Sequence, residues 1–331
     1  MMLKVRTILL LAFLVIFVFS SFALAAGSDN HGKTVVIRIA TAFAPGHILA
    51  DSCVAFKTLI EEESKGRITV QLELGKDTEA NVDLRCSKGE IDMQWTGGQP
   101  LQDFAPQYFF FNAPYVIKDY DHFLRVWKSP LGNEARALVL KNGNMLCLTT
   151  AYRGFRQTTA NKPLITPADF AGLKLRLPPV PDWISIWEAV GANPVAVPLT
   201  GLYDALKNGT AEASEGDLAQ ISSFKLSEVQ SHLIMTNHLV AVGWSTINQT
   251  FYKSLSGKDQ KLITKCIKQV GWWATLKTKV DEGNLMSQLQ ANHIQVVIPD
   301  AAAIRDKAKP AVDSLFTTKW PVTTWSEVLS F

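Results

Sequence analysis

Two separate segments of this chain show the same order of strand and helix patterns. In the first, apolar stretches typical of strands at 35–43, 67–74 and 91–95 alternate with helical spacing at 47–66 and 80–87. In the second, strands at 173–177, 194–197 and 211–214 alternate with helices at 182–190 and 201–209. A β-α-β-α-β order produces a mainly parallel sheet, so the sequence predicts an α/β protein with two α/β lobes.

The second half of the chain predicts how these lobes are connected. A long strand pattern at 239–248 returns after the second unit, and residues 257–292 have mostly helical spacing. We expect Pro310 and Pro321 to interrupt the helical tail. Because a strand returns so late, the chain is expected to cross between the lobes more than once, which would make a hinge.

These crossings give expected lobe boundaries. Lobe I is expected to comprise residues 33–153 plus 242–281, and lobe II residues 154–241 plus 282–331.

The N-terminal residues 1–26 have the pattern of a signal peptide. Lys4 and Arg6 precede an apolar run at 8–19, and Ala23-Leu24-Ala25 is a small-x-small cleavage site. Cleavage near Ala25/Ala26 would export the mature chain. The alternative is an uncleaved membrane anchor, since the apolar run is nearly long enough to span a bilayer.

The charge balance gives no reason to expect nucleic acid or a lipid surface as a partner. The chain has 33 Lys and Arg against 30 Asp and Glu, and cleavage would remove two of the basic residues. A nearly neutral mature chain lacks the basic face that such partners require.

Motifs for catalysis, metals or cofactors are not found. The six histidines show no metal-ligand spacing, and neither a GxSxG nor a GxxxxGK[ST] sequence occurs. Four cysteines, Cys53, Cys86, Cys147 and Cys266, allow three pairings, and free buried thiols fit equally well. We therefore expect no enzyme and no cofactor, and we assign no metal site, although the sequence leaves open whether a metal ion assists binding.

Candidate binding residues follow from the predicted strands, because ligands of parallel sheets bind beyond the carboxyl ends of the strands. Arg176 lies near the end of the 173–177 strand, before Pro178. By the same rule, Trp95 and the Glu215-Gly216-Asp217 turn lie at the ends of their own strands.

Seven stretches in this order make the chain resemble the solute-binding proteins of tripartite ATP-independent periplasmic (TRAP) transporters. They are "FKTLIEEESKGRITVQLEL", "GEIDM", "FNAPYVI", "GFRQTTANKPL", "DFAGLKLRLP", "VGANPVAVPLTGLYDALKNG" and "TINQTFYKSLSGKDQ". The resemblance implies a periplasmic-binding-protein type II-like fold, in which two lobes close on an organic acid. It also implies a periplasmic location and delivery of the acid to the membrane subunits of a transporter driven by an ion gradient.

The resemblance also implies roles for two arginines. Arg176 matches the family arginine that grips the ligand carboxylate, and Arg156 matches a second one used by some members. A guanidinium is always charged and offers two parallel donors that fit a carboxylate. The alternative is an ion pair between Arg176 and Asp169, Asp182 or Glu215.

One departure from the family concerns Gly216, where many relatives carry an asparagine that helps to hold the carboxylate. Either the ligand relies more on Arg176 and Arg156, or it is bound differently. Asp217 would then be a partner for a ligand ammonium or hydroxyl, or a solvated turn residue.

Tryptophans suggest an apolar wall for the site. Trp95 and Trp244 fall where strands are expected to meet the cleft, whereas Trp183 and Trp187, four residues apart on a helix, are expected in the core. This pattern favours an aromatic or otherwise apolar carboxylate. The alternative functions are an exported sensory or scavenging module and an exported enzyme.

Overall fold

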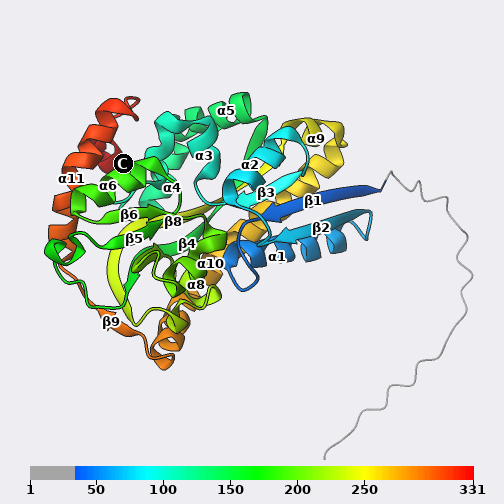
Figure 1. The fold of residues 1–331 in the computed structure, drawn as a ribbon. Coiled ribbons are helices and arrows are strands. Elements are labelled where there is room, and N and C mark those ends of the chain that lie inside the picture. Colours follow the sequence, from blue (N-terminus) through cyan, green and yellow to red (C-terminus); the bar gives the residue numbers. More distant parts are fainter. Residues whose placement is uncertain (1–33) are drawn as a thin grey trace, which may run out of the picture. The chain divides into compact units, whose positions relative to one another are not determined.

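The computed structural model describes residues 34–331, so the predicted signal peptide, residues 1–26, lies outside the described residues. Its strands form one nine-stranded sheet in the order β2-β1-β3-β8-β4-β7-β5-β6, with β9 beside β8 (Figure 1). The strands are β1 Val35–Thr41, β2 Ile68–Leu74, β3 Met93–Thr96, β4 Met145–Ala160, β5 Lys174–Leu177, β6 Asn193–Ala196, β7 Ala213–Gly216, β8 His232–Asn248 and β9 Gln295–Val297.

Twelve α-helices and four short 3₁₀ helices of this part of the chain surround the sheet. The α-helices are α1 Ile48–Glu63, α2 Glu79–Lys88, α3 Gln99–Phe104, α4 Tyr120–Lys128, α5 Pro130–Gly143, α6 Pro181–Val190, α7 Leu202–Lys207, α8 Leu218–Ser223, α9 Gln249–Ser254, α10 Gly257–Ala291, α11 Ala301–Thr318 and α12 Trp325–Ser330. The 3₁₀ helices are η1 Pro106–Asn112, η2 Pro167–Phe170, η3 Leu199–Gly201 and η4 Leu226–Glu228.

Two long antiparallel strands, β4 and β8, join the two halves of the sheet. They have 16 and 17 residues, and β1, β2 and β3 lie on one side of them while β5, β6 and β7 lie on the other (Figure 1). Pairs within each half are parallel, as is the β8–β9 pair, whereas the β3–β8, β8–β4 and β4–β7 pairs are antiparallel. The predicted α/β class with two lobes and several crossings is confirmed. The sheet is nevertheless continuous, because β4 and β8 are long enough to serve both lobes.

Most predicted elements occur within a few residues of their expected positions. The strands β4 and β9 and the helices α3, α4, α5, α8 and α9 have no counterpart among the predicted elements. Pro310 lies inside α11, so the expectation that it interrupts the helix was wrong. Its side chain is exposed, and the carbonyl that its missing N–H leaves free can be hydrated there. Meanwhile Ile304, Ala308 and Val312 bury the opposite face of the helix.

The long helix α10 supports β4 at the centre of the molecule. Gly271 allows the close approach, because a Cβ at this position would lie 2.6 Å from Thr149 Oγ1. One turn further, the Thr275 hydroxyl accepts a hydrogen bond from the Tyr152 backbone N–H at 3.1 Å. This contact fixes β4 next to Arg153, where the site described below begins.

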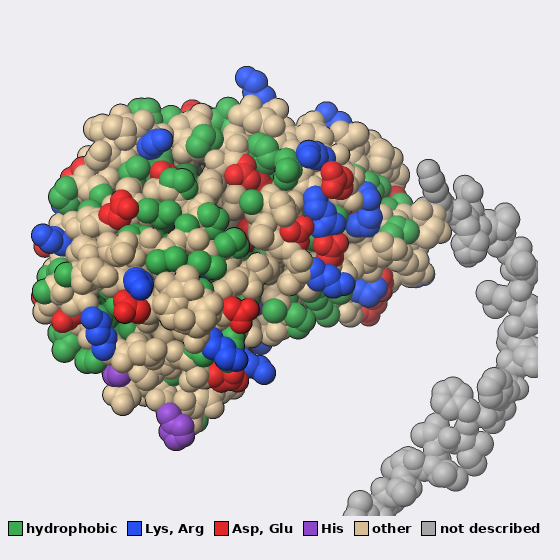
Figure 2. Space-filling model, viewed as in Figure 1, with side chains coloured by type: hydrophobic (Ala, Val, Ile, Leu, Met, Phe, Trp, Pro, Cys, Tyr) green, Lys and Arg blue, Asp and Glu red, His purple; other side chains and the backbone are tan. Residues whose placement is uncertain are grey.

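Surface and helix properties within residues 34–331 agree with the charge analysis. On the face shown in Figure 2, basic and acidic side chains are interspersed rather than gathered by sign. No helix in this range is both long and apolar enough to cross a membrane.

Candidate ligand-binding site

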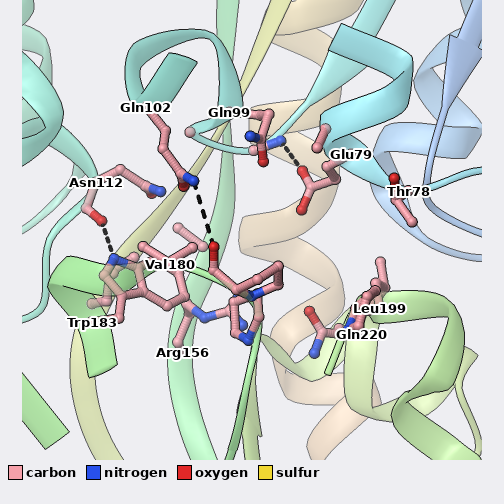
Figure 3. A pocket seen from close by; sticks show the side chains of 18 of the residues that line it. Thr78, Glu79, Gln99, Gln102, Asn112, Arg156, Val180, Trp183, Leu199 and Gln220 are labelled. Atoms are coloured by element: carbon pink, nitrogen blue, oxygen red, sulfur yellow. Dashed lines mark hydrogen bonds between the residues drawn. The ribbon is translucent and has the colours of Figure 1, made fainter. Parts of the chain in front are cut away.

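A cavity of about 280 Å³ lies where β4, β5 and β8 meet loops and helix ends from both halves of the sheet (Figure 3). Three arginines, Arg153, Arg156 and Arg176, line it. Its other lining residues are Phe43, Thr78, Glu79, Ala80, Gly97, Gly98, Gln99, Gln102, Asn112, Pro178, Pro179, Val180, Trp183, Pro198, Leu199, Gln220, Leu239 and Ala241.

A β-bulge in β4 brings two of the arginines to the same cavity. Residues three apart on a regular strand face opposite sides of the sheet. Here Tyr152 lies opposite Val242 and Gly154 lies opposite Ala241, which makes Arg153 an extra residue. Gly154 has a φ of +101°, a conformation that favours glycine. The extra residue turns Arg153 and Arg156 toward the same side.

Arg156 is held by Glu215 at the end of β7. Its Nε and Nη2 donate to the two carboxylate oxygens, the second at 2.7 Å, and Nη2 also reaches the Glu215 backbone oxygen at 3.2 Å. His238 lies 3.2 Å from the same carboxylate. Burial acts to raise the pKa of Glu215, but the charge of Arg156 and the hydrogen bond from His238 lower it to about 2. Arg156 is thus already neutralised by a buried carboxylate.

Arg153 is paired in the same way with Asp217. Its Nη2 donates to the Asp217 carboxylate at 2.9 Å, and His47 Nε2 lies 3.5 Å from the other oxygen. Burial acts to raise the pKa of Asp217, but the charges of Arg153 and His47 hold it well below its usual range. Asp217 also caps α8 by accepting from the Gln220 backbone N–H at 2.8 Å. Its side chain is therefore committed to the protein.

Arg176 differs, because no carboxylate of the described residues forms a salt bridge with it. Its side chain is 1% exposed, Nε donates to the Val197 carbonyl at 2.8 Å, and Nη2 is buried without a hydrogen-bond partner. Burial lowers the pKa of Arg176 to about 10. A buried cation without a counter-ion is costly, and an anion in the cavity would relieve that cost.

The carboxylates considered as alternative partners of Arg176 are engaged elsewhere. Asp169 accepts from the backbone N–H groups of Ile165 and Thr166. Asp182 accepts from the indole N–H of Trp320 at 3.1 Å, and Glu215 binds Arg156.

The rest of the cavity wall combines amides with a few rings. Gln99, Gln102, Asn112 and Gln220 supply side-chain amides, and Glu79 lies at the opposite side of the cavity from Arg156 (Figure 3). Phe43, Trp183 and the prolines supply apolar surface. Amides both donate and accept hydrogen bonds, so this wall suits a ligand with hydroxyl groups as well as a carboxylate.

Only some of the residues that the sequence predicted for the site line the cavity. Arg176 and Arg156 line the cavity, whereas Gly216 and Asp217 lie beside it without lining it. Trp95 and Trp244 are buried in the core at 0% and 1% exposure, and neither lines the cavity. Their expected place on an apolar wall must therefore be corrected: strand ends that fall near the cleft still point some side chains into the core.

Several lining residues were missed by the sequence reasoning. Trp183, expected in the core, lines the cavity, and its indole N–H donates to the Asn112 carbonyl at 2.7 Å. Arg153 was missed because only the bulge turns it inward. A glycine between two arginines in Arg153-Gly154-Phe155-Arg156 is the signal that suggests such a bulge.

Within residues 34–331 there is neither a group of side chains arranged to bind a metal ion nor a disulfide bond. No group of three or more His, Cys, Asp or Glu side chains in this range is arranged to hold a metal ion. The four cysteines are free thiols, and burial raises the pKa of Cys147 to about 12 and that of Cys266 to about 11.

Comparison with known proteins shows the family. Residues 39–319 match the bacterial extracellular solute-binding protein family 7, and the chain belongs to this family. Its members are binding proteins of transport systems rather than enzymes, and the resemblance to TRAP solute-binding proteins is confirmed.

Three relatives illustrate the similarity. The chain is 30% identical over 290 residues to the sialic acid-binding periplasmic protein of Vibrio cholerae, covering 86% of this chain and 89% of that one. It is 25% identical to the 2,3-diketo-L-gulonate-binding periplasmic protein of Escherichia coli, covering 80% and 82%. A TRAP solute-binding protein from Roseobacter denitrificans, solved with bound L-galactonate, has a TM-score of 0.83 and 23% identity, covering 90% and 99%. This last likeness supports the two-lobed fold.

Proposed function

We propose that this chain is the periplasmic solute-binding protein of a TRAP transporter, that it captures a hydroxylated organic carboxylate, and that it delivers this acid to the membrane permease. In this proposal residues 1–26 are a cleaved signal peptide. The observation that carries the proposal is the buried guanidinium of Arg176, whose Nη2 lacks a partner beside a cavity. Family membership adds the transport role.

The charge of the site favours one carboxylate. Glu215 neutralises Arg156 and Asp217 neutralises Arg153, so Arg176 is the guanidinium left for a ligand among these three. One bound carboxylate would give Arg176 the partner that it lacks, and Glu79 across the cavity would repel a second one.

The lining also bears on the rest of the ligand. The expected aromatic or apolar acid loses its main support because Trp95 and Trp244 are in the core. Four amide side chains and Glu79 instead favour a ligand with several hydroxyl groups. The names of the two relatives, which bind sialic acid and 2,3-diketo-L-gulonate, point in the same direction.

The binding mechanism follows from the proposed lobes, residues 33–153 plus 242–281 and residues 154–241 plus 282–331. Both arginines of the anion site, Arg156 and Arg176, belong to the second lobe. We propose that the acid binds this lobe first and that the first lobe then closes over it, supplying Glu79, Gln99 and Gln102.

Thermal unfolding against a panel of carboxylates tests this function. The mature protein is first unfolded and refolded to remove any carried-over ligand. An acid present at about a hundred times its dissociation constant adds about 2.7 kcal/mol of stability. We expect sugar acids and hydroxy acids to raise the unfolding temperature more than aromatic acids.

Substitutions identify the anchor. Arg176→Ala should abolish the shift, and Arg156→Ala should weaken it less. Lys174→Ala, at the exposed first residue of the same strand and outside the cavity lining, should leave it unchanged. If no carboxylate shifts the wild-type protein, the proposed function is wrong.

A further inference from the structure

Gln220 is a buried amide at the anion end of the cavity. Its side chain lies on α8, one turn after Asp217 caps that helix, and it is 2% exposed. Its Nε2 donates to the Glu215 backbone oxygen at 3.2 Å. Arg156 Nη2 donates to the same oxygen at 3.2 Å, so the amide of Gln220 lies beside the Arg156 guanidinium.

This hydrogen bond fixes which end of the amide faces the ligand. A backbone carbonyl only accepts hydrogen bonds, so the NH₂ group must point to Glu215. The side-chain oxygen of Gln220 is then directed toward the cavity, as Figure 3 shows. No hydrogen-bond donor of the described residues is paired with this oxygen. The site therefore presents an acceptor next to its guanidinium groups.

Gly216 makes room for this arrangement. A Cβ at position 216 would lie 2.5 Å from Gln220 Nε2 and 2.8 Å from the carbon of the amide. Gly216 is not among the residues with positive φ, so its backbone would accept other residues without strain. The absence of a side chain at 216 thus serves to let the amide of Gln220 fold back against β7.

We propose that Gln220 recognises the group on the carbon next to the ligand carboxylate, and that the ligand is a 2-hydroxy acid. The inference rests on the proposed carboxylate-binding function. Arg176, Arg156 and Gln220 line the same cavity, and the last two share the Glu215 backbone oxygen, so a carboxylate bound by the two arginines would have its neighbouring carbon within reach of the Gln220 oxygen. A 2-hydroxyl donates to that oxygen, whereas a 2-keto group or a methylene has nothing to donate. A 2-ammonium would also donate, but the guanidinium of Arg176, which has no carboxylate partner among the described residues, repels it.

Four small acids test this recognition in the refolded wild-type protein, with affinities measured by calorimetry or ligand-observed NMR. Racemic lactate, pyruvate, propionate and alanine differ only at the carbon next to the carboxylate, and all are small for the cavity. We expect lactate to bind about tenfold more tightly than pyruvate or propionate, because a ligand that covers the Gln220 oxygen without donating to it leaves this acceptor unpaired. Alanine should bind more weakly than lactate.

Three variants assign the preference to Gln220. Gln220→Met keeps the length of the side chain but removes the acceptor. In this variant lactate should bind about as tightly as pyruvate and propionate. Gly216→Ala should have the same effect, because its Cβ displaces the amide, and it should add nothing to Gln220→Met. Gln99→Met, an amide elsewhere on the wall, should change the affinities for lactate and propionate by the same factor.

The outcomes separate this inference from the proposed function. Equal binding of lactate, pyruvate and propionate, or tighter binding of alanine, would overturn the role of Gln220 while carboxylate binding stands. A lactate preference that persists in Gln220→Met would also overturn it. If neither these acids nor the longer acids of the panel bind, the carboxylate function itself fails.

Discussion

Arg156 and Arg176 are both buried at the cavity, but only Arg156 has a carboxylate partner in the protein. Glu215 holds Arg156 through two side-chain hydrogen bonds, whereas Arg176 donates only to the Val197 carbonyl. The same residue type therefore has a structural role at one position and an unsatisfied charge at the other. This difference affects stability as well as binding.

Replacement of each arginine by methionine should change the ligand-free protein in different ways. Arg156→Met leaves Glu215 buried with only His238 as a close partner, which should lower the free energy of unfolding by about 3–5 kcal/mol. Arg176→Met removes a buried cation that has no counter-ion, so this variant should be at least as stable as the wild type. Urea unfolding of the refolded proteins measures both. A similar loss in the two variants would show that Arg176 is neutralised within the protein.

At the scale of elements, the bulge in β4 decides which side chains reach the cavity. Gly154 follows the extra residue Arg153 with a φ of +101°, and a Cβ there would lie 2.9 Å from Glu282 Oε1. An alanine at this position must strain the backbone and push against Glu282. The bulge would then relax, and relaxation would rotate Arg153 and Arg156 relative to each other.

Gly154→Ala should therefore reduce both stability and ligand affinity. The cost of the backbone conformation alone is about 1–2 kcal/mol. Gly172→Ala is the matched control, because Gly172 also has a positive φ, +71°, but has no atom within 4 Å of a Cβ and lies away from the cavity. Thermal unfolding and calorimetry should show a stability loss in both variants and an affinity loss only in Gly154→Ala. Unchanged affinity in Gly154→Ala would mean that the bulge does not position the arginines.

The same element shows how far sequence reasoning reached. Alternating apolar residues in 173–177 and the following proline predicted that Arg176 would end a strand at the site, because these patterns depend on near neighbours only. The strand β4 was missed, since its pattern in Met145–Ala160 is broken by the bulges and its burial depends on β8 and α10. Arg153 and Gln220 were missed for a related reason: their positions depend on an extra residue and on a missing side chain at 216.

At the scale of the whole molecule, hydrogen bonds connect the two proposed lobes around the cavity. The Trp183 indole N–H donates to the Asn112 carbonyl at 2.7 Å, and Gln102 Nε2 approaches the Pro179 carbonyl at 3.5 Å (Figure 3). Asp217 in turn meets His47 at 3.5 Å. Each pair joins residues 33–153 to residues 154–241, so these contacts would break if the lobes separated. They therefore favour the closed arrangement.

Trp183→Phe should weaken ligand binding by destabilising that closed arrangement. The substitution keeps a ring in the wall but removes the donor to Asn112, and a hydrogen bond of this kind contributes about 0.5–1.5 kcal/mol, or roughly two- to twelvefold in affinity. Trp187→Phe is the control. Trp187 lies on the same helix as Trp183, but its buried indole N–H has no hydrogen-bond partner among the described residues. Calorimetry gives the affinities, and fluorescence energy transfer between labels on the two lobes gives the closed fraction. We expect Trp183→Phe to lower both quantities and Trp187→Phe to leave the closed fraction unchanged. If Trp183→Phe lowers the affinity but not the closed fraction, the indole contributes to the wall of the cavity and not to closure.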